Sequence, residues 1–183
     1  MIAKRIFDIT FSFFGLILTA PLMMIIAFLI KLDSPGPVFY RGVRFGHFGK
    51  PFKIFKFRTM VADAEKLGGP STPADDPRLT KIGKFLKSYQ LDELPQLINV
   101  LKGEMSLVGP RPEVPLYVKM MTEEEKRTIL SVRPGMTDWA SIWDFHEGEI
   151  LKGSKDPEKV YMEKIRPKKI KLQLKYIKER SFW

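Results

Sequence analysis

Residues 9–30, with the sequence ITFSFFGLILTAPLMMIIAFLI, are almost wholly apolar and carry no charge. As a helix, a segment of this length could span the hydrocarbon core of a bilayer. The run is too long for the apolar region of a cleavable signal sequence, and no small-residue cleavage site follows it. The segment predicts an N-terminal membrane anchor. Pro21, near its middle, predicts a break because proline removes one helical hydrogen bond and clashes with the preceding turn.

The charges on both sides of this run bear on how it lies in the membrane. Basic residues flank it at both ends: Lys4 and Arg5 before it, and Lys31, Arg41 and Arg44 after it. Because positive flanks favour the cytoplasmic side, both ends are compatible with that side. A helix–break–helix hairpin that enters one leaflet and returns at Pro21 fits this pattern, with Thr19 available to the backbone groups that the break frees. A kinked helix that spans the membrane once fits equally well.

The composition narrows the class of partner. The chain of 183 residues has no cysteine, so disulfides and thiolate metal sites are excluded. Its two histidines, His47 and His146, are too few for a histidine-rich zinc site. The formal net charge of +10 indicates an anionic partner, which leaves nucleic acid, an anionic membrane surface and a phosphorylated substrate.

Beyond the anchor, the pattern predicts short strands and then helices. Residues 38–45 and 52–59 are rich in Val, Phe, Tyr and Ile, and they predict a β-hairpin with a longer loop. Helices are expected over 79–89, 122–130 and 161–180. The first of these carries lysines opposite its apolar side, which is typical of a helix on a membrane surface and equally of an ordinary amphipathic helix. The predicted fold class is α+β, mostly helical, with a re-entrant N-terminal hairpin, a small β-hairpin and amphipathic interfacial helices around the functional site.

A second stretch, SYQLDELPQLINVLKG at residues 88–103, holds two adjacent carboxylates where a helix should begin. Pro95 in the first turn and Gly103 just past the end bound that helix. Apolar residues recur at helical spacing, so one face packs while the acidic start stays free. Asp92 and Glu93 are therefore either a helix cap stabilised by the dipole or a pair of functional carboxylates.

Basic residues on stiff backbone are the third feature. Arg111 lies between two prolines, and a guanidinium held in this way suits bidentate phosphate binding, although structural arginines in loops are common. Arg133 begins a second rigid turn, Arg-Pro-Gly. In the second expected strand, Lys56 alternates with aromatic residues, which fits a functional strand or a solvated sheet edge.

As a set, these residues resemble the bacterial sugar transferase family, the monotopic phosphoglycosyl transferases that act on polyprenyl phosphate. The matching motifs follow the family's order over about residues 3 to 140: KRIFD at 4–8, GPVFY at 36–40, FKIFKFRTM at 52–60, DPRLTKIG at 76–83, LDELPQL at 91–97, NVLKG at 99–103, MSLVGPRP at 105–112 and RPG at 133–135. No single motif is specific, but the joint match is.

The resemblance implies a reaction. Such enzymes transfer a sugar 1-phosphate from a UDP-sugar to undecaprenyl phosphate, release UMP, and start bacterial glycoconjugate assembly such as capsule, exopolysaccharide or lipopolysaccharide O-antigen. The family's Asp-Glu dyad falls on Asp92 and Glu93. Asp92 would attack the β-phosphorus and carry a covalent phospho-sugar intermediate, and Glu93 would be the ligand of Mg²⁺. The phosphates would be held by Lys56, Lys87, Arg111 and Arg133.

The resemblance also implies location and partners. Residues 1–33 would form a re-entrant anchor turned at Pro21, and residues 34–183 a catalytic domain on the cytoplasmic face of the bacterial inner membrane. The expected partners are the UDP-sugar, the polyprenyl phosphate and the membrane, without nucleic acid. A homodimer and glycosyltransferases of the same pathway are possible further partners. At 137–141 the chain reads TDWAS where the family commonly has Thr-Gly-x-x-Gln, and residues 143–149 are a candidate for lining a sugar pocket.

Two functions without catalysis stay open. A membrane-anchored basic binding protein would explain the charge but gives no reason for the dyad. An inactive family member that serves as a scaffold for glycosyltransferases would keep the motifs but lack turnover. The intact dyad, Lys56 and Arg111 count against the scaffold.

Overall fold

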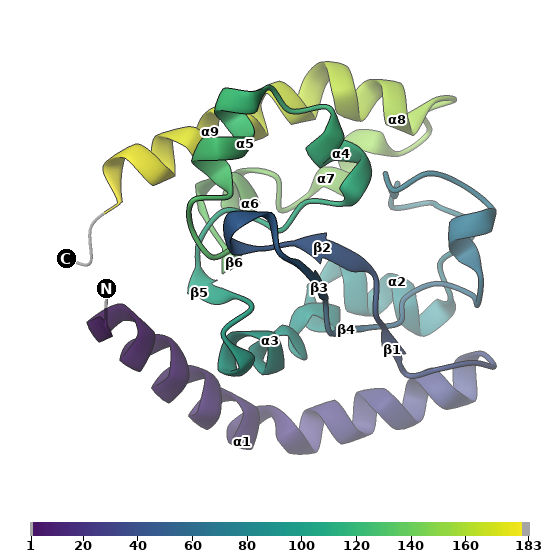
Figure 1. Cartoon of the computed structure of the whole chain (residues 1–183). Helices are drawn as coiled ribbons and strands as arrows, with labels where there is room; N and C mark the ends of the chain where they lie inside the picture. Colours follow the sequence, from purple (N-terminus) through teal and green to yellow (C-terminus); the bar gives the residue numbers. More distant parts are fainter. Residues whose placement is uncertain (1, 181–183) are drawn as a thin grey trace.

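The computed structural model describes residues 2–180, most of them in helices, with three two-stranded sheets among them. The long helix α1 (Ile2–Asp33) lies along one side of the molecule. Helices α8 (Pro157–Val160) and α9 (Arg166–Glu179) lie on the opposite side, and the sheets lie between (Figure 1). The expected class, mostly helical with small sheets, is confirmed.

Helix α1 continues through Pro21, and it bends instead of breaking (Figure 1). The expected helix–break–helix hairpin is therefore not confirmed. A proline removes a single N–H, and a helix can absorb the clash of its ring by bending. Thr19 Oγ1 donates to the carbonyl of Gly15 at 2.7 Å, not to that of Ile17, four residues before the proline. This back-bonding within the helix is itself a source of bending.

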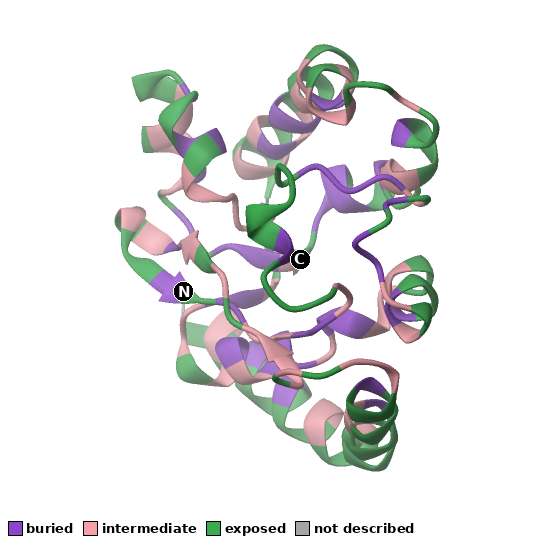
Figure 2. Cartoon of the chain, turned by 90° about the vertical axis from the view of Figure 1, so that its right-hand side faces the viewer, coloured by how far each residue is buried: buried purple, intermediate pink, exposed green. Residues whose placement is uncertain are grey.

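The apolar surface of α1 is mostly exposed. By length and composition α1 could cross a membrane, and only 11% of its most apolar window is buried in the molecule. Figure 2 shows exposed residues predominating along this helix, at the bottom of the view. An exposed apolar helix of this length is consistent with membrane association.

The first turns of α1 are bound into the rest of the protein. Asp8 is buried and accepts hydrogen bonds from Ser106 Oγ at 2.9 Å and from the Leu107 N–H at 3.1 Å. Arg5 donates to two carbonyls in the last turns of α3 (Gln96–Lys102), at 2.7 and 2.9 Å. The start of α1 thus caps the end of α3, next to the dyad.

The expected β-hairpin is confirmed, and it is split into two short ladders. Its elements are β1 (Phe39–Tyr40), β2 (Val43–Phe45), a 3₁₀ turn (His47–Gly49), β3 (Pro51–Lys53) and β4 (Lys56–Phe57). β1 pairs antiparallel with β4, and β2 with β3. Phe57 packs against Ile26 and Ile30 of α1 and Leu86 of α2 (Lys81–Ser88), which joins the hairpin and both helices in one core.

Helix α2 lies directly against the backbone that leaves the hairpin. A Cβ on Gly83 would lie 1.8 Å from the carbonyl oxygen of Thr59, so only glycine allows this approach. Thr80 caps the helix by accepting from the Gly83 N–H at 3.0 Å. Before it, the chain passes through a 3₁₀ turn (Ala64–Lys66) and a polar loop.

The dyad lies just ahead of α3, not within its first turn. Asp92 and Glu93 are in a 3₁₀ turn (Leu91–Glu93), and the α-helical residues begin after Pro95. Gly103 ends α3 with φ +82°, as expected for a glycine cap. The expectation that the acidic start stays free was wrong: both carboxylates are buried, because cations from other elements neutralise them.

A parallel ladder of β5 (Ser106–Val108) and β6 (Gly135–Thr137) was not predicted. Here the chain segments around Gly109 and Gly135 cross in contact, and a Cβ on Gly135 would lie 2.0 Å from the Gly109 nitrogen. The Gly135 N–H donates to the Pro110 carbonyl at 2.9 Å. The two Gly- and Pro-containing turns of the sequence are therefore one structural unit.

Short helices complete the fold: α4 (Pro115–Lys119), α5 (Glu123–Ile129), α6 (Trp139–Trp143), α7 (Glu147–Leu151) and a π-helical turn (Tyr161–Ile165) that leads into α9. The expected helix at 122–130 is confirmed, with Thr122 and Glu125 forming a reciprocal capping box. The expected final helix is confirmed as α9, with Pro167 in its first turn.

Candidate active site

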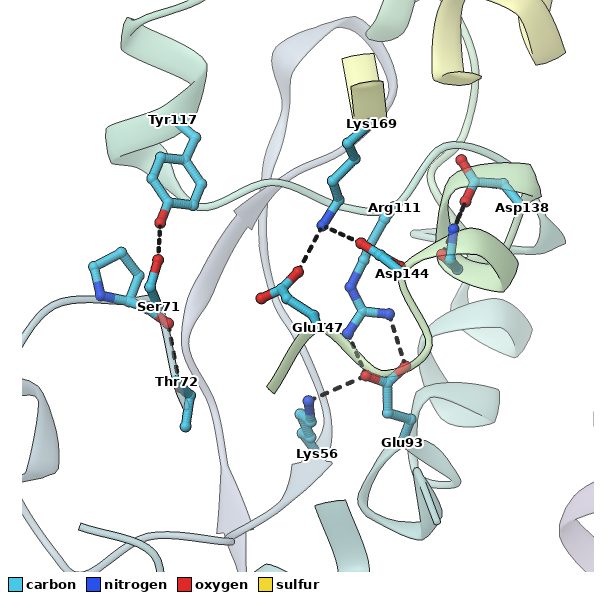
Figure 3. Close-up of polar contacts among 12 residues, drawn as sticks. Lys56, Ser71, Thr72, Glu93, Arg111, Tyr117, Asp138, Asp144, Glu147 and Lys169 are labelled. Atoms are coloured by element: carbon cyan, nitrogen blue, oxygen red, sulfur yellow. Dashed lines mark hydrogen bonds and ion pairs between the residues drawn. The ribbon is translucent and has the colours of Figure 1, made fainter. Parts of the chain in front are cut away.

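Three elements bring four charged side chains together. Lys56 comes from β4, Asp92 and Glu93 from the turn before α3, and Arg111 from the loop after β5. Lys56 Nζ lies 2.9 Å from Asp92 Oδ2 and 3.1 Å from Glu93 Oε1. The Arg111 guanidinium holds both oxygens of Glu93, one of them at 3.2 Å through Nη1 (Figure 3). We call these four residues the dyad cluster.

Asn99 fixes the dyad to the strand that carries Lys56. Its fully buried side chain accepts from the Phe55 N–H at 2.8 Å and donates to the Lys53 carbonyl at 3.0 Å. These bonds tie α3 to the backbone between β3 and β4. Lys56 follows directly, so its position relative to Asp92 is set by a buried amide.

The crossing of Gly109 and Gly135 in turn holds Arg111. The prolines on either side restrict its backbone, and the Gly135 N–H bonds the carbonyl just before it. Arg133 itself is exposed and donates from Nε to the Gly103 carbonyl at 2.9 Å, so it closes the end of α3. Among the residues expected to hold phosphates, the structure brings Lys56 and Arg111 together but places Arg133 apart from them.

The charges of the dyad cluster stabilise one another. Burial alone would raise the pKa of Glu93, but the charges of Arg111 and Lys56 outweigh it and hold that pKa well below its usual range. Burial lowers the pKa of Lys56, and the charges of Asp92 and Glu93 reverse this, so the net shift is upward. The charge of Glu93 raises the pKa of Arg111. At neutral pH, Glu93, Lys56 and Arg111 are all ionised.

The charges of the dyad cluster also affect the pKa of Lys87, in the last turn of α2. Burial, and then the positive charge of Lys56, lower its pKa to about 8. Lys87 is therefore a cation that titrates close to physiological pH, next to residues suited to bind phosphate.

A second charged cluster adjoins Arg111. Lys169 Nζ lies 3.1 Å from Asp144 Oδ2 and 3.6 Å from Glu147 Oε2 (Figure 3). Glu113, the residue after Pro112, adds its charge, and together these carboxylates raise the pKa of the buried Lys169 against the effect of burial. We call Glu113, Asp144, Glu147 and Lys169 the Lys169 cluster.

Sequence reasoning missed Lys169 because it stands among many lysines of α9. A signal was present in the spacing: Ile165, Lys169 and Gln173 share one helical face, and all three are buried. A lysine in line with buried neighbours needs carboxylate partners, and the acidic stretch at 143–149 supplies two of them.

The expected Mg²⁺ ligand does not fit a metal in this arrangement. Both oxygens of Glu93 contact the cations Arg111 and Lys56, which occupy the places that a divalent ion would take. Within residues 2–180 no group of three or more His, Cys, Asp or Glu side chains is arranged to hold a metal. In this arrangement the charge of Glu93 is neutralised by Lys56 and Arg111.

The whole chain, residues 1–183, matches the family model described as bacterial sugar transferase. The chain belongs to the bacterial sugar transferase family. This sugar transferase is 47% identical over 121 residues to a Bacillus subtilis (strain 168) protein whose provisional name is undecaprenyl-phosphate N-acetylgalactosaminyl 1-phosphate transferase, covering 66% of this chain and 68% of that protein. It is 41% identical over 183 residues to the UDP-glucose:undecaprenyl-phosphate glucose-1-phosphate transferase of Escherichia coli (strain K12), covering 98% of this chain and 37% of that protein.

A third relative is named as the UDP-N-acetylgalactosamine-undecaprenyl-phosphate N-acetylgalactosaminephosphotransferase of Aeromonas hydrophila, 42% identical over 141 residues, or 76% of this chain and 33% of that protein. This sugar transferase thus spans about a third of the length of its longer relatives. The expected family is confirmed, and with it the expectation that the chain is an enzyme, a phosphoglycosyl transferase.

Proposed function

We propose that this sugar transferase moves a sugar 1-phosphate from a UDP-sugar to undecaprenyl phosphate, with release of UMP, and so begins the assembly of a bacterial polysaccharide or other glycoconjugate. The relatives named for UDP-glucose and for UDP-N-acetylgalactosamine support the donor class, and all three are named for undecaprenyl phosphate as acceptor. Their different sugars leave the sugar of this chain to experiment.

In the first half-reaction, a carboxylate oxygen of Asp92 attacks the β-phosphorus of the donor. The bond from that phosphorus to the bridging oxygen breaks, and UMP leaves with the oxygen and the electron pair. In the second, a phosphate oxygen of the acceptor attacks the same phosphorus. The bond to Asp92 breaks, which regenerates its carboxylate and gives a polyprenyl diphosphate sugar. Two displacements at one centre are each easier than a single transfer between two bound anions.

The observation that carries this proposal is the different environment of the two carboxylates. Glu93 is clamped by both Arg111 and Lys56, whereas Asp92 contacts a single cation, with Lys56 Nζ 2.9 Å from its Oδ2. A carboxylate held by few bonds keeps its lone pairs available for attack. Glu93 then serves to fix the two cations that would hold the phosphates.

The membrane part of the proposal rests on α1. We assign residues 1–33 as the anchor and 34–183 as the catalytic part on the cytoplasmic face of the inner membrane, where the lipid acceptor carries its phosphate at the interface. The bend of α1 and the basic residues at both of its ends support a helix that enters and leaves by the same face. Lys31 and the flanking arginines would then lie at the headgroups.

The test is UMP release from a panel of UDP-sugars by detergent-solubilised protein with undecaprenyl phosphate, in parallel with Mg²⁺ and with EDTA. UMP that requires Asp92, the lipid and a particular sugar supports the proposal and names the donor. The EDTA arm tests the expected need for Mg²⁺. Folded protein that releases no UMP from any donor would contradict the proposal and favour the scaffold function.

A further inference from the structure

A cleft of about 110 Å³ opens beside the dyad cluster. Its lining includes Ser71, Arg111, Glu113, Tyr117, Glu147 and Lys169. Arg111 is shared by the dyad cluster and the cleft, since it binds Glu93 and also lines the cleft. A donor whose phosphates lie on Arg111 and Lys56 would therefore extend its next group into this cleft.

The cations that line the cleft are already engaged. Arg111 is bound to Glu93, Lys169 lies against Asp144, and Arg44 donates to the Val43 carbonyl at 2.8 Å. What the cleft offers to a ligand is mainly acceptors. The carboxylates of Glu113 and Glu147 receive no hydrogen bond from a side chain in the described part of the chain, and the contact of Glu147 Oε2 with Lys169 Nζ is a longer one of 3.6 Å. The hydroxyls of Ser71 and Tyr117 lie nearby, 3.0 Å from each other.

Such a lining suits a polyhydroxylated ring better than a phosphate or a base. Carboxylates repel phosphate but accept strong, charge-assisted hydrogen bonds from hydroxyls. Uracil presents one N–H donor and two carbonyl acceptors, which matches a surface of acceptors poorly. A hexose presents several hydroxyl donors.

We propose that this cleft is the subsite for the sugar of the donor, with Glu113 and Glu147 as the residues that select its hydroxyl pattern. The assignment rests on the proposed function, because the sugar is bonded to the phosphorus that Asp92 would attack. Lys169 is a positioning residue: from the buried face of α9 it holds Asp144 and Glu147 together and keeps their mutual repulsion from moving α7.

The experiment measures kcat/KM for UMP release with UDP-glucose, UDP-galactose and their N-acetylated counterparts. It compares the wild type with Glu147→Gln and Glu113→Gln, and measures the inhibition constant of UMP for each protein. If the wild type accepts just one of these donors, the comparison uses deoxy analogues of that donor's sugar in place of the other donors. Glu149→Gln, on the same helix and in an exposed pair with Lys152, is the matched control. The Glu147 side chain is 28% exposed, so its amide should leave the fold intact.

The expected result is that Glu147→Gln changes the ratio of kcat/KM between donors by about tenfold or more, because a hydroxyl loses a charged partner. The inhibition constant of UMP should stay within about twofold, because the proposal places no contact of the nucleotide in this cleft. Equal losses for all donors together with weaker UMP inhibition would assign the cleft to the nucleotide and overturn the proposal. Unchanged ratios in both variants would overturn it as well. If the wild type and Glu149→Gln release no UMP at all, the proposed function fails instead.

Discussion

The dyad cluster and the Lys169 cluster are built from the same kinds of residue, but they differ in balance and in access. The dyad cluster pairs two carboxylates with two cations, whereas the Lys169 cluster surrounds one lysine with three carboxylates. The cationic side chains of Lys56 and Arg111 are 23% and 29% exposed, and that of Lys169 is 6% exposed.

This difference separates two uses of charge. Cations that are held in place but still reachable can exchange part of their pairing for the phosphates of a substrate. A buried lysine cannot, and its work is to keep carboxylates at fixed positions. The first cluster is thus suited to the reaction and the second to recognition and support.

Asp92→Asn breaks the dyad cluster most completely. The amide keeps the shape of the side chain but is not a nucleophile, so we expect turnover to fall by at least about 1000-fold. UMP release by folded protein measures this, with thermal unfolding as the check on the fold. Asp63→Asn, in an exposed surface pair with Lys66, is the control and should keep full activity. An Asp92→Asn protein with near-normal turnover would exclude the proposed role.

Arg111→Lys tests whether the residue between the two clusters must bind through the two nitrogens of a guanidinium or whether a single positive charge suffices. A lysine cannot hold both oxygens of Glu93 and reach the phosphates in a planar arrangement, so we expect kcat/KM to fall by about 100-fold. Steady-state kinetics measure this, and the exposed Arg127→Lys serves as the control. A loss of less than about threefold would show that charge alone suffices there.

Lys169→Met breaks the second cluster. The change leaves Asp144 and Glu147 without their cation in a buried place, which should lower the free energy of unfolding by about 3 to 5 kcal/mol. Denaturant unfolding in detergent measures this. Lys171→Met, exposed on the same helix, should change stability by less than about 0.5 kcal/mol. Equal stability of the two variants would show that the Lys169 cluster contributes no support.

The pH dependence of kcat/KM tests whether Lys87 adds a third cation to the dyad cluster. Its pKa is lowered to about 8, so it is charged below that pH and neutral above it. Because only the charged form would attract the phosphates of the donor, we expect kcat/KM for the donor to fall as pH rises through about 8; one unit higher only about a tenth of the lysines stay charged. In Lys87→Arg this fall should vanish, and in Lys84→Arg, exposed on the same helix, it should persist. The same fall in both variants would assign it to another group.

The sequence predicted elements that depend on local signals. The strands at 38–45 and 52–59, the capped helix at Thr122 and the glycine end of α3 follow from residue type and spacing, and the structure confirms them. Short motifs also singled out the dyad, Lys56 and Arg111, and the structure brings these four side chains into contact.

What could not be predicted depends on contacts between distant segments. The β5–β6 ladder depends on the close approach of the backbones at Gly109 and Gly135. The sequence around either glycine does not indicate that the other lies next to it. Arg133 was expected at the phosphates, but the same crossing turns it toward the end of α3. Pro21 was expected to break α1, and the helix bends instead.

The central claim is that Asp92 forms a covalent bond to the phosphorus of the donor. It is tested most directly by incubating the protein with its UDP-sugar in the absence of undecaprenyl phosphate, followed by acid quenching and peptide mass spectrometry. The account predicts one equivalent of UMP and a sugar-phosphate mass on the peptide that contains Asp92, both absent from Asp92→Asn. UMP that appears only when the acceptor is present, with no modified peptide, would contradict it.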